Sequence, residues 1–178
     1  MGYFLFQSLQ EKDLPLLYRW FQEPTINQWY ARGKHWSLDE IKKKYEPRVF
    51  GKEDVPSFIV YKNETPIGFI QYYRFENGFP EGIKDHRNLL FQHHDKDELV
   101  GIDLFIAEAD MRGKGLGVKL IHQFTEAFLR QFSAIVVDPA VNNVGALRCY
   151  EKAGFVRTAF SEDPDYFVML KMNTSHSI

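Results

Sequence analysis

A glycine-rich turn constrains the fold of this chain more than any other feature. The residues Arg112-Gly113-Lys114-Gly115-Leu116-Gly117 follow an apolar stretch, Leu99 to Ala107, that has the composition of a strand. Apolar residues then recur at helical spacing at Leu116, Leu120, Ile121, Phe124 and Phe128. Glycine permits positive φ and close approach of a ligand, and a helix N-terminus presents free N–H groups at the positive end of its dipole. The sequence therefore predicts a strand–turn–helix unit with an anion site at the turn.

The spacing of the glycines excludes two common nucleotide-binding motifs. The turn does not match Gly-x-Gly-x-x-Gly, and no Gly-Lys-Ser/Thr ends it, so neither a Rossmann nor a P-loop site is predicted. The alternative for three glycines in five residues is a strand-to-helix turn that binds nothing.

Composition limits the class of protein. The chain has 178 residues, 44% hydrophobic and 26% charged, which suits one globular domain. The formal charge of −2 gives no basic excess for nucleic-acid binding. Cys149 is the only cysteine, so no intramolecular disulfide forms. Without a signal-peptide pattern or an apolar run of roughly 18 to 20 residues, we expect a soluble cytoplasmic protein with no membrane partner.

The apolar periodicity predicts the element order β-α-α-β-β-β-α-β-α-β-β. The first helix is expected to start after Asp13 and to end at Pro24, before a loop with Trp29 and Tyr30. The remaining expected elements are a helix over 38–46 with a Ser37–Glu40 capping box and a stop at Pro47, a hairpin of 57–62 and 67–75, strands 3–9, 99–107, 134–137, 155–160 and 166–172, and helices from 116 to 128 and from 143 to about 153. We predict an α/β (α+β mixed) fold in a single domain over 1–178, with a loop insertion at 76–98 and a flexible tail at 173–178.

A second motif follows about 30 residues after the glycine turn. It is Asn143-x-x-Ala146-x-x-x-Tyr150-x-Lys152-x-Gly154-Phe155. Together with the strand Gly101 to Ala107 and the glycine turn, it resembles the GNAT N-acetyltransferases. Within that superfamily the chain looks like the aminoglycoside 6'-N-acetyltransferases, through the motifs Gly101-Ile102-Asp103, Lys114-Gly115-Leu116-Gly117, Asp138-Pro139, Cys149 to Phe155, Trp29-Tyr30 and Tyr45-x-Pro47. The resemblance implies a central mixed, mostly antiparallel sheet of about seven strands, flanked by about four helices.

The resemblance implies that acetyl-CoA is bound and that no metal is needed. Backbone amides would hold its pyrophosphate at Arg112, Gly113, Lys114, Gly115, Leu116 and Gly117. Asn143 and Ala146 would lie on the pantetheine side, where a side-chain amide offers both a donor and an acceptor. A backbone N–H of the strand residues Leu104, Phe105 and Ile106 would meet the thioester oxygen. The residues alone also allow Asn143 to be a plain helix cap. Asn142 is the competing candidate for the pantetheine contact.

The resemblance also assigns the reacting groups. Tyr150 would act as the general acid that protonates the coenzyme A thiolate, the alternative being a core tyrosine. Asp103 would hold the acceptor amine and take its proton, the alternative being a solvated polar residue on a strand. Asp138 is also suited to a cationic acceptor, the alternative being that it caps the turn before Pro139. Asp163, with Asp165 as the competing residue, supplies a further acid, and Trp29, Tyr30 and Tyr72 are candidates for the wall of a sugar pocket.

The expected reaction is direct acetyl transfer to a primary amine of a small polycation, most simply the 6'-amine of an aminoglycoside. The protein would work as a monomer or homodimer and confer antibiotic resistance. Two rival enzymes share the motifs, a siderophore hydroxylysine N-acyltransferase and a protein N-acyltransferase. A rival of another class is a non-catalytic GNAT module that senses acetyl-CoA.

Overall fold

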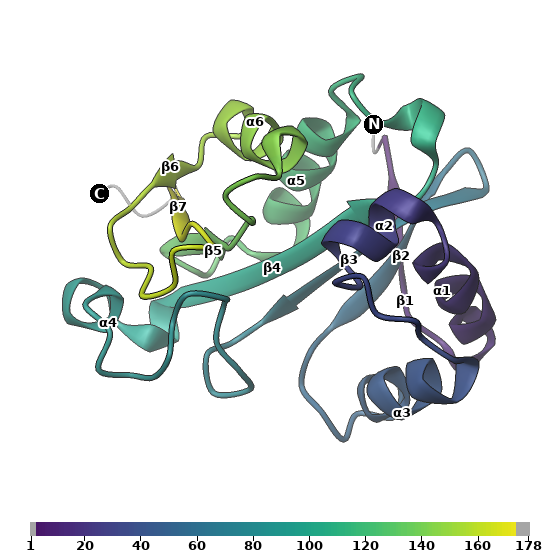
Figure 1. The fold of residues 1–178 in the computed structure, drawn as a ribbon, viewed down its shortest axis with the longest axis horizontal. Helices are drawn as coiled ribbons and strands as arrows, with labels where there is room; N and C mark the ends of the chain where they lie inside the picture. Colours follow the sequence, from purple (N-terminus) through teal and green to yellow (C-terminus); the bar gives the residue numbers. More distant parts are fainter. Residues whose placement is uncertain (1–2, 174–178) are drawn as a thin grey trace. The chain divides into compact units, whose positions relative to one another are not determined.

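A computed structural model describes residues 3–173. Seven strands within this range form one sheet of order β1-β2-β3-β4-β5-β7-β6. The strands are β1 (Leu5–Ser8), β2 (Ser57–Lys62), β3 (Thr65–Tyr73), β4 (Leu99–Ile106), β5 (Ala134–Val137), β6 (Val156–Arg157) and β7 (Met169–Met172). The α-helices are α1 (Leu14–Phe21), α2 (Pro24–Trp29), α3 (Leu38–Val49), α4 (Leu90–His93), α5 (Leu116–Phe128) and α6 (Val144–Lys152) (Figure 1). β4 and β5 pair in parallel, whereas β1 with β2, β2 with β3, β5 with β7 and β6 with β7 pair antiparallel. The predicted mixed α/β class is confirmed.

The chain divides into two compact units. The first unit comprises Met1–Gln71 and Leu104–Arg112, and the second comprises Tyr72–Asp103 and Gly113–Ile178. Each is described by itself below. Among residues 3–173, no helix combines the length and the apolarity that a membrane crossing requires.

The first unit packs α1, α2 and α3 around an aromatic core. Phe21 lies at its centre, with edge-on ring contacts to Tyr45 at 6.2 Å and to Phe105 at 6.2 Å. The rings of Phe69 and Phe105 stack at 5.6 Å. Since these side chains are at most 9% exposed, the high aromatic content serves this core before it serves any pocket.

The predicted hairpin is confirmed, and its turn explains its register. Asn63 and Glu64 have φ of 47° and 65°, so the two-residue loop has positive φ at both central positions. Lys62 therefore faces Thr65, and the second strand begins two residues earlier than the sequence indicated.

The first helix ends at Phe21, before Pro24 as predicted, but Pro24 begins a further helix that the sequence did not predict, and Pro47 lies inside a helix rather than after it. Pro24 occupies the first turn of α2, where a missing N–H leaves no bond unmade, and the carboxylate of Glu23 caps this helix by accepting from the N–H of Ile26 at 2.8 Å. Trp29 and Tyr30 consequently end a helix instead of lying in a loop. Pro47 lies inside α3, which continues to Val49.

The start of each of these helices has a local cause. The predicted capping box of α3 is present, since Ser37 accepts from the N–H of Glu40 at 3.1 Å while Glu40 accepts from the N–H of Ser37 at 2.8 Å. Asp13, in contrast, makes no cap bond to α1; it ends a short 3₁₀ turn and accepts from the N–H of Gln10 at 2.9 Å.

The second unit places α5 and α6 beside β5, β7 and β6 (Figure 1). Its core contains Phe75, Leu90, Leu99, Ala134, Val136, Val168 and Leu170. The two closing strands are shorter than predicted because the chain between Phe160 and Tyr166 forms turns stabilised by side chains. Asn173 donates to the carbonyl oxygens of Leu129 and Phe132, and the rest of the predicted tail, 174–178, lies outside the described residues.

The predicted loop insertion, 76–98, contains α4 and a 3₁₀ turn and is fixed at several points. The buried Asn88 donates from Nδ2 to the carbonyl oxygen of Phe160 at 2.8 Å and to the carboxylate of Glu162 at 2.9 Å. Glu162 also accepts from the N–H of Lys84 at 3.0 Å. These bonds hold the insertion against the segment that precedes β7.

Candidate active site

Four polar groups of the second unit act electrostatically on the phenol of Tyr73, which is half-buried at the end of β3. Burial raises the pKa of the Tyr73 phenol well above its usual value of 10, and the negative charge of Asp103 raises it further. Asp138, Glu81 and Tyr150 act on Tyr73 in the same direction. Asp103 and Asp138 also act on Tyr150. The structure thus brings together Asp103, Asp138 and Tyr150, which the sequence singled out, and adds Tyr73 and Glu81.

Asp103 is half-buried on β4, a segment that forms a strand because the residues around Asp103 are mostly apolar. Asp138 is half-buried just after β5. Asp138 accepts a hydrogen bond from the backbone N–H of Glu81 at 2.6 Å. Asp138 therefore ties the loop insertion to the end of β5. This role differs from the two that the sequence predicted for Asp138, a local cap before Pro139 and a contact with the acceptor.

Tyr150 is half-buried on α6, where its ring meets Phe155 edge-on at 5.5 Å. Burial is the first cause that raises the pKa of its phenol well above 10, followed by the charges of Asp138, Cys149 and Asp103. Within residues 3–173 its hydroxyl makes no hydrogen bond. Tyr150 is therefore a protonated donor at neutral pH whose proton is not committed to a described protein group.

Tyr73 was missed because its neighbour Tyr72 was preferred. Adjacent strand residues point to opposite faces. The Tyr72 ring lies 6.1 Å from that of Phe124 on α5. The Tyr73 ring instead lies over Gly101, where an added Cβ would stand only 2.7 Å from the Tyr73 hydroxyl oxygen. A glycine two residues before Asp103 was the available signal, because a strand glycine often marks a close approach by another group.

The glycine turn has the backbone that the sequence predicted. Gly113 and Gly115 have φ of 73° and 76°, and no heavy atom lies within 4 Å of the position of an added Cβ on either. Gly115 is the N-cap of α5, so the N–H groups that begin at Leu116 open the helix. An open approach to free amides at a dipole's positive end suits a phosphate group.

The side chain of Arg112 has a local role in the first unit. It donates to the carbonyl oxygens of Ile106 at 2.8 Å and Ala107 at 2.9 Å, and it pairs with Glu23 at 3.0 Å. The guanidinium thus closes the turn after β4. The backbone N–H of Arg112, which the resemblance assigned to the pyrophosphate, donates to the carbonyl oxygen of Ala109 at 3.3 Å.

Asn143 is the N-cap of α6, which is the alternative that its sequence position also predicted. Its Oδ1 accepts from the N–H of Ala146 at 3.2 Å, whereas Asn142 is exposed and precedes the cap. Its Nδ2 donates to nothing within residues 3–173, so a donor remains for a ligand amide.

The other candidates are placed as follows. Trp29 is half-buried, and its ring has no hydrogen bond or ring contact in the described part of the chain. Tyr30 packs edge-on against Phe105 at 4.7 Å and belongs to the core of the first unit. Phe105 is buried, while its strand neighbours 104 and 106 are half-buried. Asp163 accepts from the N–H of Asp165 at 2.9 Å and so closes a local turn.

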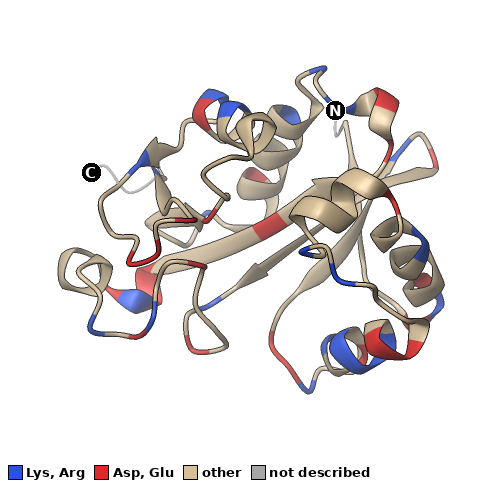
Figure 2. Cartoon of the chain, viewed as in Figure 1, with Lys and Arg blue, Asp and Glu red and all other residues tan. Residues whose placement is uncertain are grey.

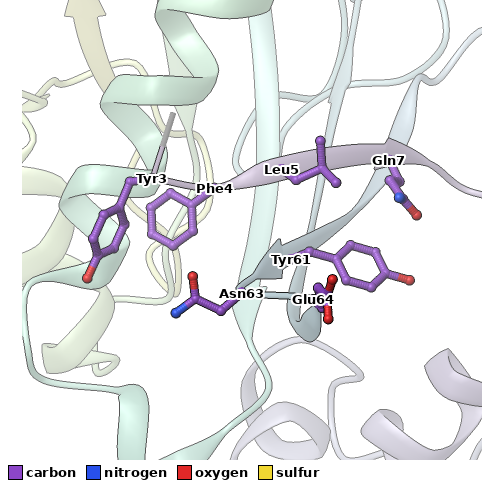
Figure 3. A pocket seen from close by; sticks show the side chains of 7 residues that line it. All are labelled: Tyr3, Phe4, Leu5, Gln7, Tyr61, Asn63 and Glu64. Atoms are coloured by element: carbon purple, nitrogen blue, oxygen red, sulfur yellow. The ribbon is translucent and has the colours of Figure 1, made fainter. Parts of the chain in front are cut away.

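One cavity of about 510 Å³ opens in the first unit, beside the turn of the β2–β3 hairpin. Figure 3 shows Tyr3 and Phe4 on one side of it and Tyr61 near Glu64 on the other. Its remaining lining residues are Leu5, Gln7 and Asn63. None of the residues predicted to bind a ligand lines this cavity.

Residues 10–162 match the family of acetyltransferase (GNAT) domains. The chain therefore belongs to the GNAT acetyltransferase family, and the predicted resemblance is confirmed. The aminoglycoside N(6')-acetyltransferase type 1 of Klebsiella pneumoniae is 32% identical to it over 160 residues, which are 88% of this chain and 76% of that protein.

Solved structures agree with this relationship. The structure of AAC(6')-Ib with paromomycin and acetyl-CoA has a TM-score of 0.81 and 30% identity, covering 98% of this chain and 96% of that one. A structure of the same enzyme with coenzyme A and kanamycin has a TM-score of 0.79 and 30% identity, covering 97% and 96%.

Proposed function

We propose that this protein transfers the acetyl group of acetyl-CoA to the 6'-amine of an aminoglycoside. The observation that carries the proposal is the meeting of Asp103, Asp138 and Tyr150 in one unit, with two carboxylates for a cationic amine and one uncommitted phenol for a leaving thiolate. Relatives about 30% identical over nearly the whole chain, whose names and titles describe aminoglycoside acetylation, support the same substrates.

The chemistry begins with the acceptor amine. An alkylammonium with a pKa of ~10.4 is almost fully protonated at pH 7, and freeing the amine costs roughly 4 to 5 kcal/mol at about 1.4 kcal/mol per pKa unit. Asp103 holds the ammonium and takes one proton, directly or through water. The amine nitrogen then bonds to the thioester carbonyl carbon, the carbon–sulfur bond breaks, and Tyr150 gives its proton to the departing thiolate. The acylated nitrogen loses its second proton, which restores the Tyr150 phenol through water.

The binding of acetyl-CoA is supported by the turn at Gly113 and Gly115. The open space over both glycines admits a pyrophosphate against the first amides of α5. The free Nδ2 of Asn143 suits a pantetheine carbonyl. The residues 104–106 of β4 are proposed to meet the thioester oxygen through a backbone N–H.

Charge supports a polycationic acceptor. Figure 2 shows acidic residues in the segment between β3 and β4 and in the segment between β6 and β7 of the second unit. With a net charge of only −2, such a concentration of acids would steer a polycation toward this unit. Trp29 and Asp163 remain proposed contacts of the sugar rings, whereas the ring of Tyr72 packs against that of Phe124 on α5.

The whole chain is proposed to act as one domain, because the family match at 10–162 runs through both units. We further propose that it works in the cytoplasm, where acetyl-CoA is available, as a monomer or homodimer.

An acceptor screen tests the proposal. Purified protein is incubated with acetyl-CoA and kanamycin, a polyamine, a hydroxylysine or a lysine peptide, and thiol release is recorded. Turnover with kanamycin, and 6'-acetylation by mass spectrometry and NMR, is the expected result. Turnover with hydroxylysine or peptide alone would reassign the acceptor, and binding of acetyl-CoA without any turnover would indicate a sensing module.

A further inference from the structure

Tyr73 is the polar group of the candidate active site that the proposed reaction leaves unused. It lies at the end of β3, and its ring is held by an edge-on contact with Phe75 at 5.9 Å and by the bare backbone of Gly101. The glycine is required here, because a Cβ on residue 101 would collide with the Tyr73 ring. The missing side chain at Gly101, two residues before Asp103 on β4, thus leaves the space that this phenol occupies.

The Tyr73 hydroxyl is not consumed by the protein. It donates to and accepts from no residue in the range 3–173, although Asp103, Asp138, Glu81 and Tyr150 all lie within electrostatic range of it. Because burial and the negative charges of Asp103, Asp138 and Glu81 raise its pKa, this phenol keeps its proton, and its oxygen remains a neutral acceptor. Such a group is suited to a ligand that brings N–H donors.

We propose that the hydroxyl oxygen of Tyr73 accepts a hydrogen bond from the acceptor amine while Asp103 takes the amine's proton, so that Tyr73 is a substrate-contacting residue that aims the nitrogen lone pair at the thioester. The inference rests on the proposed function and identifies how a primary amine is recognised.

The proton count of the amine favours a phenol over a fourth carboxylate. A primary ammonium has three N–H groups, of which one passes to Asp103. A neutral oxygen can hold one of the remaining two without competing for the proton. The lone pair first points at Asp103, where the proton was lost, and it turns to the thioester as the amine pivots about its bond to Tyr73. A fourth carboxylate would instead stabilise the ammonium and raise the cost of freeing the amine.

The test replaces Tyr73 by phenylalanine, which keeps the ring over Gly101 and removes only the hydroxyl. Because a hydrogen bond to a charged partner is worth about 1.5–3 kcal/mol, kcat/KM for kanamycin should fall roughly 10- to 100-fold, while the Kd of acetyl-CoA by calorimetry stays within twofold. Tyr18→Phe is the matched control, since that half-buried tyrosine packs on the core of the first unit, and its kcat/KM should stay within twofold.

A second variant displaces the hydroxyl without removing it. Gly101→Ala puts a methyl group against the Tyr73 ring, and kcat/KM for kanamycin should again fall at least tenfold in protein whose unfolding is still cooperative. In the double variant, kcat/KM for kanamycin should fall by less than the product of the two single-variant factors, because both substitutions act on the same hydroxyl.

The outcomes separate this inference from the proposed function. Wild-type protein that leaves kanamycin unmodified overturns the proposed function and, with it, the role of Tyr73. Wild-type protein that acetylates kanamycin while Tyr73→Phe does so within twofold overturns the role of Tyr73 alone. Equal losses in kanamycin turnover and in acetyl-CoA affinity would mean that Tyr73 only supports the fold, which also overturns it.

Discussion

The carboxylate of Asp138 accepts a hydrogen bond from the backbone N–H of Glu81 at 2.6 Å, although the two residues are 57 positions apart in the chain. One acidic group therefore serves both the electrostatics of the candidate active site and the position of the loop insertion. Any substitution of Asp138 changes the two together unless the variant is chosen to separate them.

We expect Asp138→Asn and Asp138→Ala to differ in a defined way. Asparagine keeps an oxygen acceptor for the Glu81 N–H, whereas alanine leaves it without one. Hydrogen exchange at Glu81 should therefore accelerate roughly tenfold or more in the alanine variant and much less in the asparagine variant. Both variants lose the charge, so KM for kanamycin should rise in both. Equal exchange in the two would show that the bond does not hold the loop.

At the glycine turn, Gly115→Asp should weaken acetyl-CoA binding at least tenfold. The added carboxylate would repel the pyrophosphate at the start of α5. Gly115→Asn is the matched control, because Asn and Asp tolerate the positive φ of 76° about equally and differ in charge. Calorimetry should give a much smaller loss for asparagine; identical affinities in wild type and aspartate variant would remove the phosphate site from this turn.

Removing the proposed general acid should affect the rate rather than acetyl-CoA binding. Tyr150→Phe is expected to lower kcat about 10²- to 10⁴-fold with little change in acetyl-CoA affinity. Since the pKa of this phenol lies well above 10, it stays protonated, and the wild-type rate should not decline through Tyr150 ionisation below pH 10. A normal kcat in the variant, with chemistry shown to be rate-limiting, would return Tyr150 to a packing role.

Asp103→Asn keeps the shape of the side chain and removes its charge and its basicity. Most kanamycin acetylation should be lost, and rising salt should raise KM for kanamycin more than KM for acetyl-CoA in the wild type, because several exposed ion pairs are screened together. Asp39→Asn, on the exposed face of α3, controls for the change in net charge. Steady-state kinetics in 50 to 500 mM salt distinguishes the cases, and a KM for kanamycin that ignores salt would contradict the polycation assignment.

The attachment of the loop insertion should depend on pH in the acid range. Hydrogen bonds from the N–H of Lys84 and from Asn88 hold the pKa of Glu162 below its usual value of 4.5. The stabilisation is therefore fully present above that usual value and is lost as pH falls through the lowered pKa. The protection factor of the Lys84 N–H, taken against the intrinsic exchange rate at each pH, should fall as the pH is lowered below 4.5, and Glu162→Gln should flatten this dependence. A wild-type rate with only the intrinsic pH dependence would dissociate Glu162 from the loop.

Much of the fold followed from signals that are local in the chain. The Ser37–Glu40 capping box, the hairpin turn at Asn63 and the glycine turn at Gly115 each set their geometry within four residues. The class of fold, the family and the order of strands could be predicted for this reason. The helix that starts at Pro24 was not predicted because a helix-breaking residue is also a helix-starting residue when, as after Glu23, a cap precedes it.

What only the tertiary structure decided is which distant groups meet. The sequence by itself, through short contiguous motifs that resemble a family, singled out Asp103, Asp138 and Tyr150 as candidates for the chemistry. It did not determine that Tyr73, rather than Tyr72, belongs with them, because that depends on the pairing of β3 beside Gly101. A one-residue change of strand register exchanges the two faces of a sheet, and that register is set by the packing of the whole sheet and not by the residues next to the tyrosines.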